Sequence, residues 1–336
     1  DMWHQDYSDC PNGVYVKFKY DYNLQRADMF NDHVGQVTLY VFDENGNYIT
    51  QQTETNSALS SPLKDPNYVM HVENLQPGKY QFLALAGQNA YADQLTSGRA
   101  KFVRTTPSAT GDKMQELEVN LDHENKGEYD EVVNNSLPLD TLWQGLGNET
   151  VEVKDLQVTH HTISLIRDTK QLTISLHQLD KPADIHAEDF SYQITDANGY
   201  INYDNSLLPD EELTYTPYKT WTTEFTTPEG TVQERTAHAA LMFSRLVLHP
   251  ATENDKNAIL SIWNKKTGEE VVRINLADCL AQGRGAFENM NYSAQEFLDR
   301  EYDYKLDFFL KGDKWQYVKL GISILDWSKR IQRADL

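Results

Sequence analysis

Hydrophobic and polar residues alternate in short runs along this chain, and a period of two is the pattern of a half-buried β-strand. In residues 14–22, Val14, Val16 and Phe18 fall on one side of such a strand, while lysines and tyrosines fall on the other. Similar runs predict further strands at residues 37–42, 68–72, 80–86 and 117–121. Residues 26–34 are expected to form a short helical segment.

Turn residues separate these runs. Asn45-Gly46, within residues 43–47, accepts positive φ at both central positions and predicts a hairpin. Pro77-Gly78 predicts a second turn, because proline presets φ and glycine accepts the left-handed conformation. Residues 50–66, which are rich in Gln, Thr, Ser and Pro, are expected to form a long loop, and the acidic residues 122–135 an exposed one.

The β pattern restarts in the second half. Residues 172–176 and 190–194 alternate, and the latter run into Asn198-Gly199 much as the earlier strand runs into Asn45-Gly46. We interpret this order as a weak internal repeat of two similar sandwiches; two unrelated all-β domains are the alternative. Hairpins are predicted within residues 259–276 and 302–327, and a helix capped by Ser293 within residues 293–299.

Length and charge narrow the class of protein. At 336 residues, about two domains are expected, which we place at residues 12–150 and 151–336 after an N-terminal segment, residues 1–11. Many short strands with regular turns are typical of antiparallel β-sandwiches, so the predicted fold is all-β with short helices in the connections. The net charge of −21 argues against nucleic acid as a partner and against unaided docking on an anionic bilayer.

The two cysteines, Cys10 and Cys279, are too far apart in sequence for a zinc motif or a redox pair. In an exported protein they could form one disulfide, and two independent thiols are the alternative. No run reaches the roughly 18 apolar residues of a membrane span. The residues before Cys10 are not the small, apolar run of a lipidation site, so we expect any lipid-bearing cysteine to lie upstream of Asp1.

No motif predicts a catalytic residue, a metal site or a cofactor. Residues 43–47 lack the ligand spacing of a calcium loop. A solvated loop, rather than a divalent-ion site, is expected for the acidic group Asp122, His123, Glu124, Glu128, Asp130 and Glu131. His160 and His161 are adjacent and would point to opposite faces of a strand. Ser164 and Ser175 have no nucleophile-elbow motif, and Gly145-Leu146-Gly147 lacks a phosphate-loop context. We therefore expect a protein that is not an enzyme.

Aromatic residues are the remaining lead. Trp143, Tyr215, Tyr218 and Trp221 lie in segments expected to be Pro- and Thr-rich loops. Such residues could stack on sugars or anchor a protein partner, and ordinary packing against a sheet explains them equally well.

Eight segments in order give the chain a resemblance to a known family. They are CPNGVYVKFKYDYN (10–23), DMFNDHVGQVTLYVFDENGNYI (28–49), LQPGKYQFLALAGQNAY (75–91), HHTISLIRDTKQLTISL (160–176), SRLVL (244–248), LSIWNKKTGEEVVRINL (260–276), FLDREYDYKLDFFL (297–310) and KLGISILDW (319–327). Together they resemble the FimB-type fimbrial anchor family of Bacteroides-type bacteria.

This resemblance implies two tandem transthyretin-like β-sandwiches in a lipoprotein of the outer membrane that is built into fimbriae, or pili, at the cell surface. It implies fimbrillin-type subunits as partners, assembly by β-strand exchange, and no catalytic residues. The expected function is thus a non-enzymatic anchor or an accessory or tip subunit in cell adhesion. The alternative is a surface glycan-binding lipoprotein with β-sandwich domains.

Overall fold

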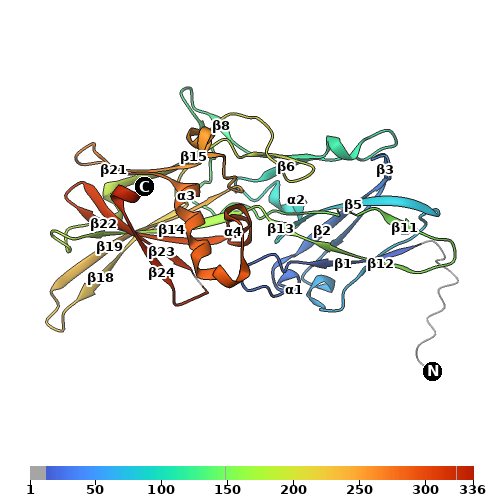
Figure 1. The fold of residues 1–336 in the computed structure, drawn as a ribbon, viewed down its shortest axis with the longest axis horizontal. Helices are drawn as coiled ribbons and strands as arrows, with labels where there is room; N and C mark the ends of the chain where they lie inside the picture. The colour runs from blue at the N-terminus through green and yellow to red at the C-terminus, as the bar shows by residue number, and fades with distance from the viewer. Residues whose placement is uncertain (1–12, 148, 323) are drawn as a thin grey trace.

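The computed structural model describes residues 13–147, 149–322 and 324–336, and over these residues the chain is all-β, as predicted (Figure 1). The connections between its strands contain short α-helices, which are α1 (Phe30–His33), α2 (Tyr91–Gln94), α3 (Leu276–Ala281) and α4 (Ala294–Arg300). They also contain 3-10 helices, which are η2 (Pro62–Lys64), η3 (Met114–Glu116), η4 (Ala187–Asp189), η5 (Ala251–Lys256), η6 (Gln282–Met290) and η7 (Arg333–Asp335). Among the helices described, none has the length and apolar character that crossing a membrane requires.

The N-terminal half stacks three sheets. The central sheet has the order β13 (Ile166–Arg167), β10 (Trp143–Leu146), β5 (Gly78–Gly87), β2 (Gln36–Asp43), β3 (Tyr48–Thr55), with β11 (Val151–Val153) also paired to β5. One outer sheet has the order β12 (Thr159–Ser164), β1 (Val14–Lys19), β4 (Met70–Val72). The other has the order β16 (Tyr200–Asn202), β7 (Glu118–Leu121), β6 (Phe102–Thr105).

Strand β2 lies at the centre of this stack and is buried on both faces. Val37 and Leu39 join a core with β1, whereas Tyr40 and Phe42 join a second core that continues into the C-terminal half. Six successive residues of β2 are therefore buried. The predicted strand is confirmed, but the half-buried alternation expected for it is wrong, because a sheet covers each face.

The C-terminal half is a sandwich of two sheets. The first has the order β21 (Glu270–Asn275), β20 (Ile259–Asn264), β15 (Phe190–Asp196), β17 (Leu213–Tyr215), β9 (Asp130–Glu131), β8 (Glu124–Asn125). The second, which we call the outer sheet, has the order β18 (Lys219–Thr226), β19 (Val232–Phe243), β14 (Lys170–Gln178), β22 (Asp303–Lys311), β23 (Lys314–Ile322), β24 (Ser328–Gln332). Leu172, Ile174 and Leu176 of β14 are fully buried between the two sheets, as their alternation predicts.

Strands from both sides of residue 150 share sheets. β12 pairs with β1 in parallel, β16 pairs with β7, and β17 pairs with β9 in parallel. A third parallel pair joins β14 to β22, and most other neighbours are antiparallel. Because the alternation of hydrophobic residues does not identify the partner of a strand, these long-range pairings could not be predicted from the sequence. The division at residues 150 and 151 stays a prediction.

Two segments expected to be loops contain strands. β3 pairs with β2 through Thr55, so the long loop predicted from residue 50 is wrong over its first six residues. No residue of β3 is buried, and its Thr and Gln side chains therefore give no hydrophobic period. The acidic segment at residues 122–135 likewise contains the small hairpin β8–β9.

The two Asn-Gly turns have different structures. Asn45-Gly46 joins β2 to β3 as predicted, but only Gly46 has positive φ, at 79°, and the ladder shifts register beside Phe42. Asn198-Gly199 instead connects β15 to β16, which lies in another sheet. The second turn is not a hairpin, so the proposed equivalence of the two segments is wrong.

The capped helix is confirmed: α4 follows Ser293, whose Oγ accepts a hydrogen bond from the Glu296 N–H at 3.1 Å.

Figure 1 shows the arrangement of the two halves along the long axis of the molecule. β1, β11 and β12 lie toward one end, and the β18–β19 ribbon and the C-terminus lie at the other. The elements that form the candidate site belong to this second end.

Candidate functional site

The solvent-facing side of the outer sheet carries a ladder of stacked rings. Because side chains alternate along a strand, the inward residues of β14, β22 and β23 fill the core while their neighbours face solvent. Three rings stack across neighbouring strands. His177 lies 4.6 Å from Phe309, and Phe309 lies 4.5 Å from Tyr317, with interplanar angles of 10° and 14°. At the edge of the sheet, Trp221 stacks on His238 at 5.0 Å. We call these five residues the aromatic ladder.

Cationic side chains lie over the same rings. The Arg330 guanidinium lies 3.6 Å from the centre of the Tyr317 ring, and the Lys319 and Lys219 ammonium groups lie 5.3 and 4.9 Å from Phe309 and Trp221. Phe309 has a neighbouring ring on each side. A sugar that stacks on an aromatic residue needs an open ring face, and this ladder presents mainly ring edges to solvent.

The histidines of the ladder are held by polar neighbours. His177 Nε2 lies 2.8 Å from Asp307 Oδ1, and its Nδ1 lies 3.6 Å from Glu234. His238 is hydrogen-bonded to Ser175 Oγ through Nδ1 and to Thr223 Oγ1 through Nε2, each at 2.8 Å.

The contact between Ser175 and His238 is the closest approach to a nucleophile–base pair at this surface. A Ser–His–Asp triad uses a carboxylate to orient the imidazole and to stabilise its cation. Here a threonine hydroxyl takes that place, and burial lowers the pKa of His238. The geometry thus favours a neutral, structural histidine.

The predicted exposed aromatics are mostly not exposed. Trp143 and Tyr215 are each 1% exposed, and Tyr218 and Trp221 are half-buried. Trp143 packs edge-on to Tyr20 at 5.8 Å, and the Tyr215 hydroxyl donates to Asn198 Oδ1 at 2.6 Å. The placement of all four residues in exposed loops is therefore wrong, and the alternative of ordinary packing holds for Trp143 and Tyr215. Trp221 alone belongs to the ladder, on a strand that sequence patterns did not predict.

The acidic segment brings together only part of the predicted group. His123 and Asp130 lie with Glu211, which was not predicted, and one ligand atom from each falls within 4.8 Å of the others. His123 Nδ1 is hydrogen-bonded to the Leu121 carbonyl at 2.8 Å, which leaves Nε2 for another contact. Three ligand atoms, one of them from an exposed side chain, are fewer than a structural zinc or calcium site supplies. Elsewhere in this segment, Asp122, Glu124 and Glu131 form ion pairs with Lys101 or Lys126.

The other candidates behave as the sequence predicts. His160 and His161 point to opposite faces of β12, where they stack near Tyr15 and Phe82 respectively. Asp43 Oδ1 accepts hydrogen bonds from the Asn45 and Asn47 N–H groups, both at 2.9 Å, which is a turn rather than an ion site. Ser164 is exposed on β12, and the Gly145-Leu146 pair lies within β10.

The proposed bond between Cys10 and Cys279 stays a prediction, because Cys10 lies outside the described residues. Cys279 is fully buried in α3, and burial raises the pKa of its thiol to about 12. A bond to Cys279 would therefore have to form before α3 packs, because a thiol with a raised pKa reacts slowly.

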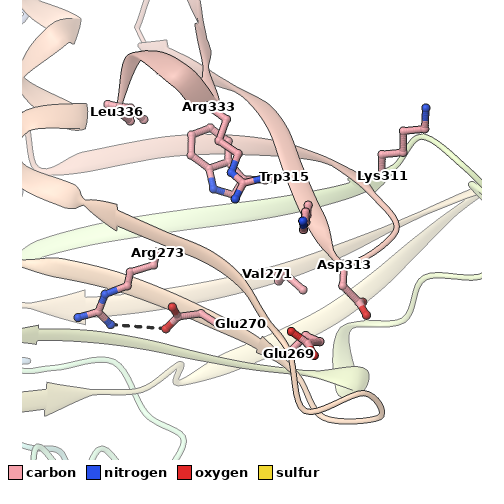
Figure 2. A pocket seen from close by; sticks show the side chains of 10 residues that line it. Glu269, Glu270, Val271, Arg273, Lys311, Asp313, Trp315, Arg333 and Leu336 are labelled. Carbon is pink, nitrogen blue, oxygen red and sulfur yellow. Dashed lines mark hydrogen bonds and ion pairs between the residues drawn. The ribbon is translucent and has the colours of Figure 1, made fainter.

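A polar pocket of about 720 Å³ lies at the end of the molecule where the C-terminus is found (Figure 2). Its walls come from β21, the β22–β23 turn and η7. Glu270 and Arg273 face each other at 3.5 Å, and Lys311 points away from them. Its charged side chains, Glu269, Glu270, Asp313, Arg273, Lys311, Lys314 and Arg333, nearly balance. The charges of the pocket therefore favour neither an anionic nor a cationic ligand.

A buried charged network lies within the C-terminal half. Arg245 donates to both carboxylate oxygens of Asp299, at 2.7 and 2.9 Å. Lys170 Nζ donates to the backbone carbonyls of Asp299 and Glu301 at 2.8 and 2.7 Å. Asp168 is fully buried, and neither of its carboxylate oxygens has a hydrogen-bond partner among the described residues. Burial raises the pKa of Asp168, and the positive charge of Arg245 lowers this pKa more than any other neighbouring group does.

Comparison with known proteins identifies relatives over nearly the whole chain. The family model described as fimbrillin-A associated anchor proteins Mfa1 and Mfa2 matches residues 7–333. The minor fimbrium anchoring subunit Mfa2 of Porphyromonas gingivalis is 24% identical over 295 residues, covering 86% of this chain and 78% of that protein.

Two solved structures from Bacteroides thetaiotaomicron have the same fold. A proposed adhesin is 29% identical, with a TM-score of 0.77 over 96% of this chain and 99% of its own. A proposed polysaccharide-binding protein is 31% identical, with a TM-score of 0.74 over 97% of this chain and 100% of its own. The all-β architecture is therefore shared with both of these solved structures.

Proposed function

This chain belongs to the family of fimbrillin-A associated anchor proteins Mfa1 and Mfa2, and from that premise we propose that it is the outer-membrane anchor, or an accessory or tip subunit, of a fimbrium. The match of the family model over residues 7–333 is the observation that carries this proposal. A structural role also fits the surface, where the contact between Ser175 and His238 lacks the carboxylate of a triad.

In this proposal the protein works as a tethered adaptor. A lipid on a cysteine upstream of Asp1 holds the N-terminal end at the membrane, and another subunit docks on the protein by strand exchange. The placement of β1 and of the β18–β19 ribbon toward opposite ends of the long axis supports it, because an N-terminal tether leaves the ribbon directed away from the membrane (Figure 1). Docking by strands suits a fold whose sheets end in open edges.

Glycan binding is the second candidate, because a relative of 31% identity is described as a proposed polysaccharide-binding protein. The covered ring faces of the aromatic ladder weigh against it. A glycan array would decide between the two: binding that is lost in Trp221→Ala, and kept in the control Trp263→Ala, would favour the glycan candidate. Trp263 is a suitable control because it is 39% exposed on a different sheet.

The anchor proposal is tested on the full-length parent protein, purified by affinity from outer-membrane extracts of its own bacterium. Mass spectrometry identifies the bound chains and the N-terminal residue. We expect fimbrillin-type subunits and a diacylglyceryl cysteine upstream of Asp1. Recovery of a glycan-transport complex, or of no fimbrial subunit, would contradict the proposal.

A further inference from the structure

Strand β18 forms one edge of the outer sheet, and its far side has no neighbouring strand. Figure 1 shows the β18–β19 ribbon projecting from its end of the molecule. None of the eight residues of β18 is buried, and Phe225 is 63% exposed. Beyond the ladder with β19, the described residues make no further backbone–backbone hydrogen bond to residues 219–226. Every second residue along this edge thus offers an N–H and a carbonyl to solvent.

The composition of β18 suits pairing on both of its edges. Its eight residues, Lys-Thr-Trp-Thr-Thr-Glu-Phe-Thr, contain four threonines, two aromatic residues, one lysine at the first position, one glutamate and no proline. Natural proteins usually protect a long edge with lysines, prolines, a short strand or a cover. β24, the opposite edge of the same sheet, follows that rule, because it has five residues, two of them the cations Lys329 and Arg330.

Among the described residues, the aromatic ladder has no further ring beyond β18, where the Lys219 ammonium lies 4.9 Å from the Trp221 ring. Trp221 stacks on His238 of β19, and the ladder ends there because no further strand supplies the next ring. Phe225 lies opposite Glu234 and extends toward the tip of the ribbon. An added strand would cover Phe225 and would place a side chain beside Trp221, continuing the stacking across one more strand.

We propose that the open edge of β18 binds an extended segment of another fimbrial subunit by β-strand addition, an inference that rests on the proposed function. Unpaired backbone groups at alternate residues are complementary to a β-strand and to no other element. A second copy of this chain is disfavoured, since each copy carries a net charge of −21. The ribbon tip, residues 224–235, contains Glu224, Glu229, Glu234 and Arg235, a net charge of −3 + 1 = −2, so the incoming segment is expected to be neutral or basic there.

β3 is the alternative edge strand for docking, because it has eight residues and none of them is buried. One of its ends is covered, because the Tyr48 N–H donates to the Asp112 carbonyl and Asn47 forms a bridge with Lys113. η4 also contacts β18, because the Ala187 N–H donates to Thr222 Oγ1 at 2.9 Å, but that bond leaves the backbone edge of β18 unpaired among the described residues. β18 is therefore the edge with the more open backbone, and β3 supplies a second position at which docking can be measured.

The test places a photo-crosslinking amino acid at Phe225 in the full-length protein, in cells that produce fimbriae. Matched probes replace Gln52 on β3 and Gln332 on β24. We expect the probe at Phe225 to form an adduct with a fimbrial subunit, and mass spectrometry to locate the bond in one continuous extended segment. The probe at Gln332 should give less than a tenth of that yield.

Each other result has a defined meaning. Fimbrial subunits that co-purify but crosslink only through Gln52 would overturn the assignment of β18 and leave the anchor function intact. An adduct between two copies of this chain would overturn the choice of occupant. Absence of any fimbrial subunit would contradict the proposed function itself.

A second measurement separates docking from folding. Phe225→Lys adds a charge to the edge without touching the core, and Leu59→Lys is its control, because Leu59 is 100% exposed in the other half of the molecule. We expect at least a tenfold loss of co-purified subunit for Phe225→Lys alone, with an unchanged circular dichroism spectrum in both variants. Equal recovery from the two variants would refute the inference.

Discussion

Replacing Arg245 with methionine should destabilise the protein strongly, because it leaves a buried carboxylate without its cation. The side chains of Arg245 and Asp299 are 15% and 7% exposed, and two hydrogen bonds join them. Removing one partner of such a buried pair costs about 3–5 kcal/mol, whereas replacing both with apolar groups is often neutral. We therefore expect Arg245→Met to lose about 3–5 kcal/mol of unfolding free energy at pH 7.5, and the double variant with Asp299→Leu to recover much of it.

The same variant should show a changed dependence on pH. Burial raises the pKa of the Asp168 carboxyl, and among the groups that lower this pKa the Arg245 cation is the strongest. Losing Arg245 should therefore raise the pKa of Asp168 further. A raised carboxyl pKa means that the folded state binds a proton that the unfolded state lacks. Because the pKa of Asp168 in the wild type is already about 7, the variant and the wild type differ in proton uptake only above that pH. The stability of Arg245→Met relative to wild type should therefore rise as pH falls from about 9 to 7, by up to about 1.4 kcal/mol per pH unit.

Urea unfolding followed by tryptophan fluorescence at pH 7.5 and 9 measures both effects. Lys256→Met is the control, because the Lys256–Glu253 pair is exposed and should contribute nothing measurable. A loss below about 1 kcal/mol for Arg245→Met, or a deficit independent of pH, would refute the view that this pair is a desolvated ion pair on which folding depends.

Three further predictions follow from packing and from the cysteines. In Gly145→Ala the added Cβ would lie 2.7 Å from a methyl carbon of β12, so urea unfolding should show a loss of about 1–3 kcal/mol, and unchanged stability would contradict that contact. A double-mutant cycle of Phe309→Ala and Tyr317→Ala should give a coupling of about 0.5–1.5 kcal/mol, and a zero value would argue against stacking. Unreduced, denatured protein should contain no free thiol, whereas two would disprove a Cys10–Cys279 bond.

Strands with one buried face could be predicted from the sequence. β1, β14 and β22 each place apolar side chains at every second position, because one face of each strand packs in a core and the other does not. The helix after Ser293 could also be predicted, since its cap depends on residues three apart. These features are local, and the chain encodes them without reference to distant partners.

The aromatic ladder could not be predicted in the same way. His177, Phe309 and Tyr317 come from three strands, and two of those strands are separated by more than a hundred residues. Each residue alone is an ordinary outward position in an alternating run. Only the parallel register of β14 with β22, which no local pattern encodes, brings His177 opposite Phe309.

β3 and β18 are two of the long strands that hydrophobic period did not reveal, and both are edge strands without a buried residue. A strand with no buried side chain adds little hydrophobic stabilisation, so core packing does not explain why its residues favour the β conformation. In β18 those residues are threonines and aromatics, which pair well with a neighbouring strand whether or not it belongs to the same chain. Residues with high β propensity and no buried side chain thus indicate an edge strand that is suited to a partner. Because such a strand has no hydrophobic period, that period alone predicts a loop around Trp221.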